Sequence, residues 1–318
     1  MISSSPSQTK RYTDLRSFLQ QRFGCRVHKI TLDAHFTCPN HDASKAVGGC
    51  IFCHQGSGHS TLGSLSIEHQ LEQGKRYLRE RHKAEKFLAY FQRYTNTYAS
   101  VATLKQLYDQ ALAVQDIVGL VVGTRPDCVS DPVLDLLQET ARRTYVAIEY
   151  GLQSIHDRTL ARVNRAHGSA EFLDAVRRTA GRGIHTCVHV MLGLPDETRT
   201  DMLETAKAIT ELPLDGIKIH LTYVLKHTVL GDMYVRGEYR PMEMTEYVET
   251  VCDFLELLPP SMVIHRLTGD PPRDLLLAPQ WTVNKWQVLN AIEAELTRRN
   301  SFQGSRWIPP RPQPIVRQ

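Results

Sequence analysis

Three cysteines that lie close together in the chain are the residues best suited to chemistry. Eleven residues separate Cys38 from Cys50, and two separate Cys50 from Cys53. Thiolates at such a spacing can surround a soft metal centre, and Gly48 and Gly49 allow the backbone to turn tightly beside it. A cubane bound by three cysteines leaves one iron without a protein ligand, so that iron is open to a cofactor or substrate.

The same loop also fits a structural zinc site. Zinc is usually held by four cysteine and histidine ligands in a tetrahedron, so a single histidine would complete the set. The candidate histidines of this stretch are His35, His41, His54 and His59. The cysteine loop alone therefore leaves both an iron–sulfur cluster and a zinc ion open.

Further polar residues recur along the chain, each just where an apolar run ends. They are Gln92, Thr124, Arg125, Glu149, Gln153, His189, Lys218 and His220. Carboxylates and amides bind hydroxyl and ammonium groups, so Glu149 and Gln153 suit a ribose and an amine. A buried Glu149 would need a partner or ligand. Arg125 could clamp a carboxylate or pair with Asp127.

Other residues of this set have equally simple structural interpretations. The stretch after Gln92 could be an ordinary surface loop, and the inward histidines could be satisfied core residues. Gly193 and Pro195 shape a tight turn whose backbone could hydrogen-bond an adenine edge. Three groups are candidates for catalysis, with inert buried side chains as the alternative: Cys128, Cys187 and His220.

Six short β-branched or aromatic runs alternate with segments of helical period and would position these groups. The predicted strands are Val27–Asp33, Lys86–Gln92, Ile117–Gly123, Tyr145–Tyr150, Thr186–Leu192 and Gly216–Leu221. The predicted helices are Ile67–Arg81, Val101–Ala113, Pro132–Arg142, Ala170–Gly181 and Thr200–Leu212. Such alternation indicates a parallel sheet covered by helices, and nearly all-apolar strands favour a barrel or a fully covered sheet.

The rest of the chain divides around this unit. We expect a leader and helix over residues 1–24, the barrel over 25–222, an extension over 223–304 and a Pro/Arg-rich tail over 305–318. The extension should contain a helix near Met244–Leu258, a strand Met262–Leu267 and a helix Val283–Arg299. Every polar motif named above then falls at the carboxyl end of a strand, where parallel α/β folds build their sites.

Composition sets the broad class. The 318 residues include seven cysteines, an odd number unevenly placed, which suits a reducing compartment and a metal role better than a disulfide framework. No apolar run approaches the roughly 18–20 residues of a membrane span, and the polar start is not a signal peptide. We therefore expect a cytoplasmic protein without a membrane partner. A net charge of +4 permits an anionic partner but does not require one.

The ordered motifs resemble those of the radical S-adenosylmethionine (SAM) superfamily. They are Cys38…Cys50-Ile-Phe-Cys53, Gly123-Thr-Arg-Pro-Asp127, Glu149-Tyr-Gly-Leu-Gln-Ser154 and Gly193-Leu-Pro195. The chain is most similar to a bacterial subgroup of about 300 residues whose SAM domain is similar to that of the Elongator catalytic subunit. Two features depart from the usual pattern: the long interval after Cys38, and Tyr94–Thr97 in place of a Gly-Gly-Glu signature.

This resemblance implies an α/β fold, a partial (β/α)6 barrel of the TIM type with a C-terminal α/β extension. It implies a [4Fe–4S] cluster on Cys38, Cys50 and Cys53, with SAM bound to the open iron through its amine and carboxylate. It also places SAM against residues of the strand ends. Phe52, Gly193 and Pro195 would lie near adenine, Gln92 near the methionine amine, Glu149 and Gln153 near the ribose and amine, and Thr124, Arg125 and His189 elsewhere around the cofactor.

The resemblance does not fix the substrate. Our hypothesis is modification of a tRNA wobble uridine, with electrons from a flavodoxin or ferredoxin. It draws on the Elongator-like SAM domain and on three basic clusters: Arg76/Arg79/Arg81/Lys83, Arg177/Arg178/Arg182 and Arg298/Arg299. The alternatives are radical modification of a small metabolite or peptide, a non-catalytic zinc-stabilised binding protein, and, for the clusters, solvated helix faces.

Overall fold

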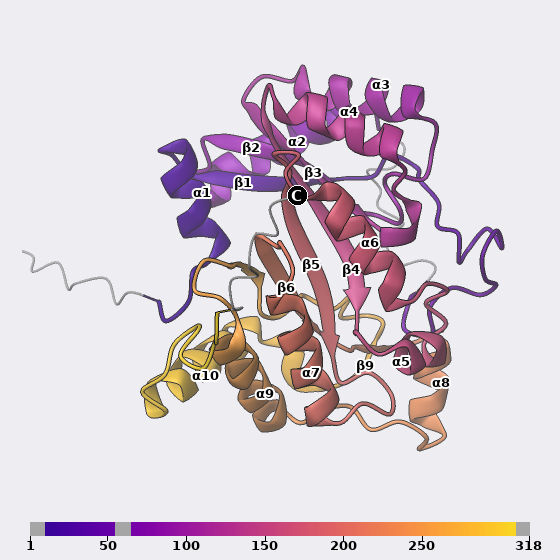
Figure 1. Cartoon of the computed structure of the whole chain (residues 1–318), viewed down its shortest axis with the longest axis vertical. Coiled ribbons are helices and arrows are strands. Elements are labelled where there is room, and N and C mark those ends of the chain that lie inside the picture. Colours follow the sequence, from indigo (N-terminus) through magenta and orange to yellow (C-terminus); the bar gives the residue numbers. More distant parts are fainter. Residues whose placement is uncertain (1–9, 55–64, 310–318) are drawn as a thin grey trace, which may run out of the picture.

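The protein was studied as a computed structural model that describes residues 10–54 and 65–309. Its centre is one parallel sheet of seven strands in the order β1-β2-β3-β4-β5-β6-β8, curled into a half-barrel (Figure 1). The strands are β1 Val27–Leu32, β2 Lys86–Phe91, β3 Ile117–Thr124, β4 Tyr145–Gln153, β5 His185–Leu192, β6 Gly216–Leu221 and β8 Val263–Arg266. The predicted partial barrel is thus confirmed. The strand that we expected in the extension, β8, joins the six barrel strands by pairing in parallel with β6.

Helices connect the strands along the outside of the sheet, as Figure 1 shows for α6 and α7. The helices are α1 Leu15–Phe23, α2 Ile67–His82, α3 Val101–Leu112, α4 Asp131–Ala141, α5 Asp157–Arg162, α6 Ser169–Thr179, α7 Arg199–Thr210, α8 Val229–Val235, α9 Met244–Leu257 and α10 Lys285–Arg298. Short 3₁₀ turns span Pro126–Cys128 and Gln280–Val283, and β7 Val224–Leu225 pairs antiparallel with β9 Leu276–Ala278. We did not predict α5, α8 or this small second sheet.

Successive residues of each strand point to opposite faces of the sheet. Along β4, Val146, Ile148 and Tyr150 belong to the large core between the sheet and the outer helices. Tyr145 and Ala147 point the other way and join a second core cluster inside the half-barrel. The next residues of this inward row, Glu149, Gly151 and Gln153, line a pocket instead. The interior therefore changes from apolar to polar toward the carboxyl ends of the strands.

Helix α1 packs against the amino-terminal part of this interior. Asp14 caps it by accepting a hydrogen bond from the Ser17 backbone N–H at 2.7 Å, and Gly24 ends it in the left-handed region with φ +69°. Leu19 is buried in the inner cluster, and Asp14 also forms a parallel bridge to Ile264 of β8. The helix thus lies against both β1 and β8, the two edge strands, and packs between them.

Part of the predicted leader (residues 1–9) and most of the predicted tail (residues 310–318) lie outside the described residues. His59, one of the histidines considered for zinc, does so as well. Among the helices of the described chain, none has the length and apolar character that crossing a membrane requires.

Candidate active site

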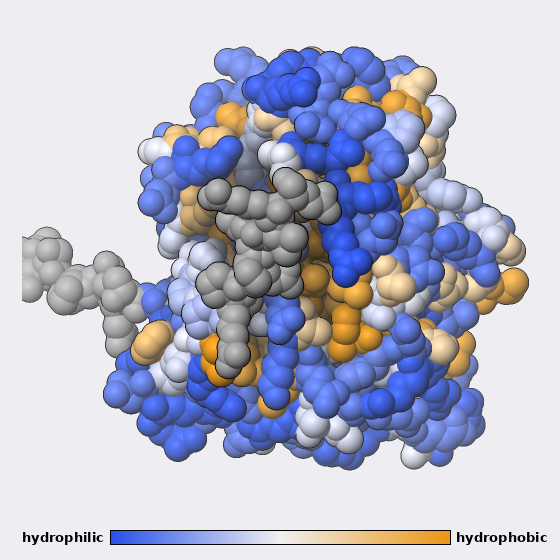
Figure 2. Space-filling view, in the orientation of Figure 1, coloured by the Kyte–Doolittle hydropathy of each residue, from blue (hydrophilic) through white to orange (hydrophobic). Residues whose placement is uncertain are grey.

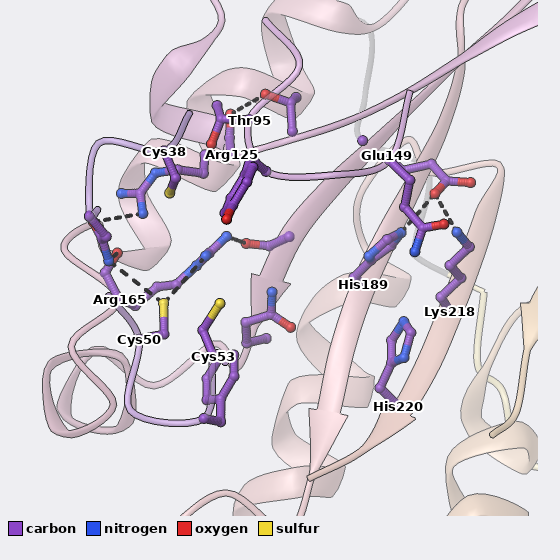
Figure 3. Close-up of a pocket in the computed structure, with 18 of the residues that line it drawn as sticks. Cys38, Cys50, Cys53, Thr95, Arg125, Glu149, Arg165, His189, Lys218 and His220 are labelled. Atoms are coloured by element: carbon purple, nitrogen blue, oxygen red, sulfur yellow. Dashed lines mark hydrogen bonds and ion pairs between the residues drawn. The ribbon is translucent and has the colours of Figure 1, made fainter. Parts of the chain in front are cut away.

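One pocket, with a volume of about 250 Å³, opens at the carboxyl ends of the strands (Figure 3). It is lined by Cys38, Asn40, His41, Cys50, Phe52, Cys53, Tyr90, Gln92, Tyr94, Thr95, Gly123, Thr124, Arg125, Glu149, Gly151, Gln153, Arg165, His189, Lys218, His220 and Arg266. Figure 3 shows two ends: the three cysteines on one side, and Glu149, His189, Lys218 and His220 on the other. The cysteine loop and the strand ends therefore face one another across a single cavity.

Nitrogen atoms surround the sulfur atoms at the cysteine end. Asn40 Nδ2 donates to Cys50 Sγ at 3.6 Å, and Arg165 Nη1 donates to the same sulfur at 3.7 Å. His41 Nε2 lies 3.6 Å from Cys53 Sγ. Burial, together with the neighbouring Cys50 and Cys38, raises the pKa of Cys53 to about 12. Three thiolates would repel one another here, so a cationic metal centre is what would hold them in that state.

The separation of the sulfurs distinguishes the two metal hypotheses. A tetrahedral zinc with Zn–S bonds of about 2.3 Å places its sulfurs roughly 3.8 Å apart. In the described chain, Cys38, Cys50 and Cys53 do not form a group whose ligand atoms all lie within 4.8 Å of one another, and adding His41 does not make one. The three sulfurs are thus not gathered as the ligands of a single zinc ion would be, and a cubane spreads its ligands more widely. The geometry fits the cluster.

Arg125 braces the cysteine loop against the end of β3. Its Nε and Nη2 atoms donate to the two carboxylate oxygens of Asp127, each at 2.9 Å, and its Nη1 donates to Asn40 Oδ1 at 2.9 Å. Lys45 of the loop adds an ion pair of 2.6 Å to Asp127. Of the two interpretations offered for Arg125, pairing with Asp127 is confirmed. Thr124 beside it shares a hydrogen bond of 2.6 Å with Thr97.

Gly151 makes room for a second arginine at the cysteine end. Arg165 Nη2 donates to the Gly151 carbonyl at 2.7 Å, and its Nε donates to His167 at 2.9 Å. A Cβ atom at position 151 would lie 2.7 Å from Arg165 Nη2 and 2.9 Å from Gln153 Nε2, so a larger residue would displace the ends of both side chains. The Arg165 side chain can therefore reach both β4 and Cys50.

Glu149 occupies the far end of the pocket and is fully buried. Lys29 Nζ donates to it at 2.6 Å, Tyr90 OH at 2.6 Å, and Lys218 Nζ forms a further ion pair. His189 Nε2 lies 3.0 Å from the same carboxylate. Despite its burial, the pKa of Glu149 lies well below its usual value, chiefly because of Lys218 and Lys29. The need for a partner, predicted from its burial, is thus met within the protein.

Burial sets the charge of the groups around Glu149. Burial lowers the pKa of Lys218 to about 8, although Glu149 opposes the shift, so this ammonium group still carries its charge at pH 7. It lowers the pKa of His189 to about 4 and that of His220 well below its usual value, so both rings are neutral at pH 7. The charges at this end are therefore one carboxylate against the cations of Lys29, Lys218 and Arg266.

The structure brings most of the predicted site residues together. Those that line the pocket are Cys38, Cys50, Cys53, Phe52, Gln92, Thr124, Arg125, Glu149, Gln153, His189 and His220. Gly193 and Pro195 are buried but do not line it, and the Gly193 carbonyl accepts from Tyr239 OH at 2.5 Å. Cys128 and Cys187 do not line it either. Burial raises their pKa, for Cys128 to about 11, as expected of inert thiols.

Sequence reasoning missed Lys29, Tyr90, Arg165, His265 and Arg266. Lys29 and Tyr90 stand at inward positions of β1 and β2 inside apolar runs, where the two-residue alternation could have indicated them. Arg165 comes from the loop after α5. A register shift between β6 and β8 pairs Lys218 with Arg266, so the intervening His265 is an extra residue that no periodicity indicates.

Comparisons with known proteins agree with this arrangement. The family model of the radical SAM superfamily matches residues 45–209, and that of the Radical_SAM C-terminal domain matches residues 214–298. The uncharacterised protein YtqA of Bacillus subtilis is 43% identical over 93% of this chain and 92% of its own length. Human Elongator complex protein 3 is 26% identical over 60% of this chain and 36% of its own length.

A solved structure extends the similarity to the fold. The archaeal Elp3 of Methanocaldococcus infernus superposes with a TM-score of 0.67 at 16% identity, covering 87% of this chain and 64% of that one. With half of the chain matched by one family model and a relative matched over nearly its whole length, the assignment is clear. The chain belongs to the radical SAM superfamily, whose members are enzymes, and its cofactors are a [4Fe–4S] cluster and SAM.

Proposed function

We propose that Cys38, Cys50 and Cys53 hold the [4Fe–4S] cluster and that SAM occupies the pocket between them and β4. The observation that carries this proposal is the convergence of three thiols, not gathered as the ligands of one zinc ion would be, on one end of a cavity at the strand ends. The chemistry that such a group supplies when bound is one electron to the SAM sulfonium, whose carbon–sulfur bond breaks to give methionine and a 5′-deoxyadenosyl radical.

In this proposal, residues around the pocket stabilise the cysteine ligands of the cluster and bind SAM. Asn40 and Arg165 donate to the Cys50 sulfur and so stabilise its negative charge. Gln92, Thr124 and Gln153 present amide and hydroxyl groups to the cavity for the polar parts of SAM. The reducing electron would come from a flavodoxin or ferredoxin.

The proposed ligand set has a direct test. Protein purified without oxygen should be brown, carry about four irons per chain and form 5′-deoxyadenosine from SAM and dithionite. Cys50→Ala should lose the colour and the activity, whereas Cys128→Ala, which changes a thiol outside the pocket, should keep both. A colourless wild-type protein with one zinc would instead support the non-catalytic zinc-stabilised module.

We propose a tRNA wobble uridine as the substrate. Support comes from the similarity to Elongator complex protein 3 and from four exposed cations that form no ion pair within the described chain: Arg76, Arg81, Lys83 and Arg177. The other five members of the three basic clusters form ion pairs with acids, as Arg178 does with Asp174 and Asp131. Hydrophilic residues predominate on the face seen in Figure 2.

The nucleosides of tRNA from deletion and parent strains decide this proposal. We expect a wobble-uridine derivative to be lost on deletion, to return with the wild-type gene and not to return with Cys50→Ala. Unchanged wobble uridines would contradict it. Radical modification of a small metabolite or peptide then becomes the better hypothesis, and the cationic far end of the pocket favours a small acidic substrate in that case.

A further inference from the structure

The far end of the pocket has more positive than negative charge. Within the described chain, Glu149 is the one acid that lines the pocket, and it is already shared by Lys29 and Lys218. The Arg266 side chain also lines the pocket and forms neither an ion pair nor a hydrogen bond with another described residue. The local sum is three cations against one carboxylate, a net formal charge of +2.

An unpaired ring nitrogen lies at the same end. His220 Nε2 is buried and has no hydrogen-bond partner within the described chain. Its ring is tilted by 48° against that of His189, with centroids 5.4 Å apart, and faces the cavity beside Lys218 (Figure 3). A buried polar atom left unpaired is costly, which is typical of a position that a ligand completes.

The position of Arg266 results from the irregular pairing of β8. Ile217 pairs with Ile264, but the next residue of β6, Lys218, pairs with Arg266, so β8 carries an extra residue at His265. The His265 side chain points inward, where its Nε2 atom lies 3.1 Å from Nε2 of His185. Arg266, the next residue, also lines the pocket. A β-bulge is the device that allows two successive residues to serve the same side.

We propose that Arg266, Lys218 and His220 form a subsite for an anionic group of the substrate, a carboxylate or a phosphate. This inference rests on the proposed function, in which SAM lies at the cysteine end and uses its own carboxylate there. The sulfonium of SAM is positively charged and gains nothing from a cationic wall. A substrate anion would bring the net charge toward zero, and its oxygens would accept from the guanidinium and ammonium groups.

The test measures binding of simple anions to the cluster-loaded protein saturated with SAM. Radiolabelled inorganic phosphate and acetate, used separately in anaerobic equilibrium dialysis at constant ionic strength, stand for the two anion types. We expect one saturable site per chain for at least one probe, and the tighter probe indicates the source. Arg266→Gln should weaken binding at least tenfold and His220→Phe several-fold.

Matched variants and a second readout keep the outcomes distinct. Arg266→Lys should stay within about fivefold of wild type, and Arg142→Gln, on the exposed end of α4, should not differ. The proposal is overturned if neither anion saturates, if Arg266→Gln binds as wild type does, or if SAM displaces the anion. SAM cleavage is assayed in the same samples. Anion binding without cleavage would refute the proposed function alone, and cleavage without anion binding would refute the subsite alone.

Discussion

Replacing Glu149 by glutamine tests whether this acid is a structural counter-ion or a residue that binds SAM. The amide keeps the size and shape of the side chain but removes the charge that faces Lys29 and Lys218, both largely buried. If the only role of Glu149 is to bind a ligand, its replacement by glutamine should barely change the stability of the ligand-free protein. If the carboxylate neutralises the two ammonium groups, as the contacts indicate, the ligand-free fold should suffer directly.

The magnitude follows from the burial. Removing one member of a buried ion pair typically costs about 3–5 kcal/mol, because the remaining charge is left without compensation. Here two ammonium groups are left, although Lys29 retains 15% of its side-chain exposure and can recover some hydration. We therefore expect Glu149→Gln to lower the free energy of unfolding by about 4 kcal/mol. At roughly 2 °C per kcal/mol, the melting temperature should fall by about 8 °C.

The assay is urea unfolding of the cluster-free protein, followed by circular dichroism at pH 7, with Glu149→Gln, Lys218→Met and the double variant. Because Lys218→Met removes one of the uncompensated charges, the free energy of unfolding of the double variant should be about 2 kcal/mol higher than that of Glu149→Gln. A Glu149→Gln protein as stable as wild type, or losses that simply add, would refute the counter-ion role.

Three further variants examine neighbouring contacts. The pKa of Lys218 is lowered to about 8 in the folded state, so the folded protein loses a proton that the unfolded chain still holds. Stability should therefore rise between pH 8 and 10.5 relative to Lys218→Met, by up to about 3 kcal/mol, in urea unfolding; a constant difference would contradict the shift. Arg165→Gln should lower the midpoint potential of the cluster on the order of 50 mV in an EPR redox titration, because a cation at Cys50 is lost; an unchanged potential would exclude this role. Gly151→Ala should displace Arg165, cost about 1–3 kcal/mol and reduce retained iron; normal iron and melting temperature would show that the space is not needed.

The sheet could be predicted because its strands are short apolar runs between helical segments. Each of the six expected strands is present, with ends displaced by at most three residues. The pocket followed from topology, since the carboxyl ends of parallel strands meet at one edge. β8 was expected as a strand, but its pairing with β6 depends on the return of α9 along the outside, which local sequence does not encode.

The interior of the site was harder to predict, because its key contacts join distant elements. Lys29 and Glu149 are 120 positions apart, and nothing near either residue indicates that they meet. Gly193 was expected beside adenine from its turn, yet Tyr239 binds its carbonyl and Met242 packs against it. Both residues belong to the extension, and the local sequence of the turn does not indicate these contacts.

The inward row of β4 explains why one strand can serve both the core and the site. Tyr145 packs with α1 in the inner cluster, Glu149 forms ion pairs with the buried lysines, and Gln153 lines the pocket. Because Glu149 finds its donors within the protein, the charged layer is ordered before any ligand arrives. Ligand binding then need not order the charged layer around Glu149. The free energy of binding therefore remains available for positioning SAM and substrate.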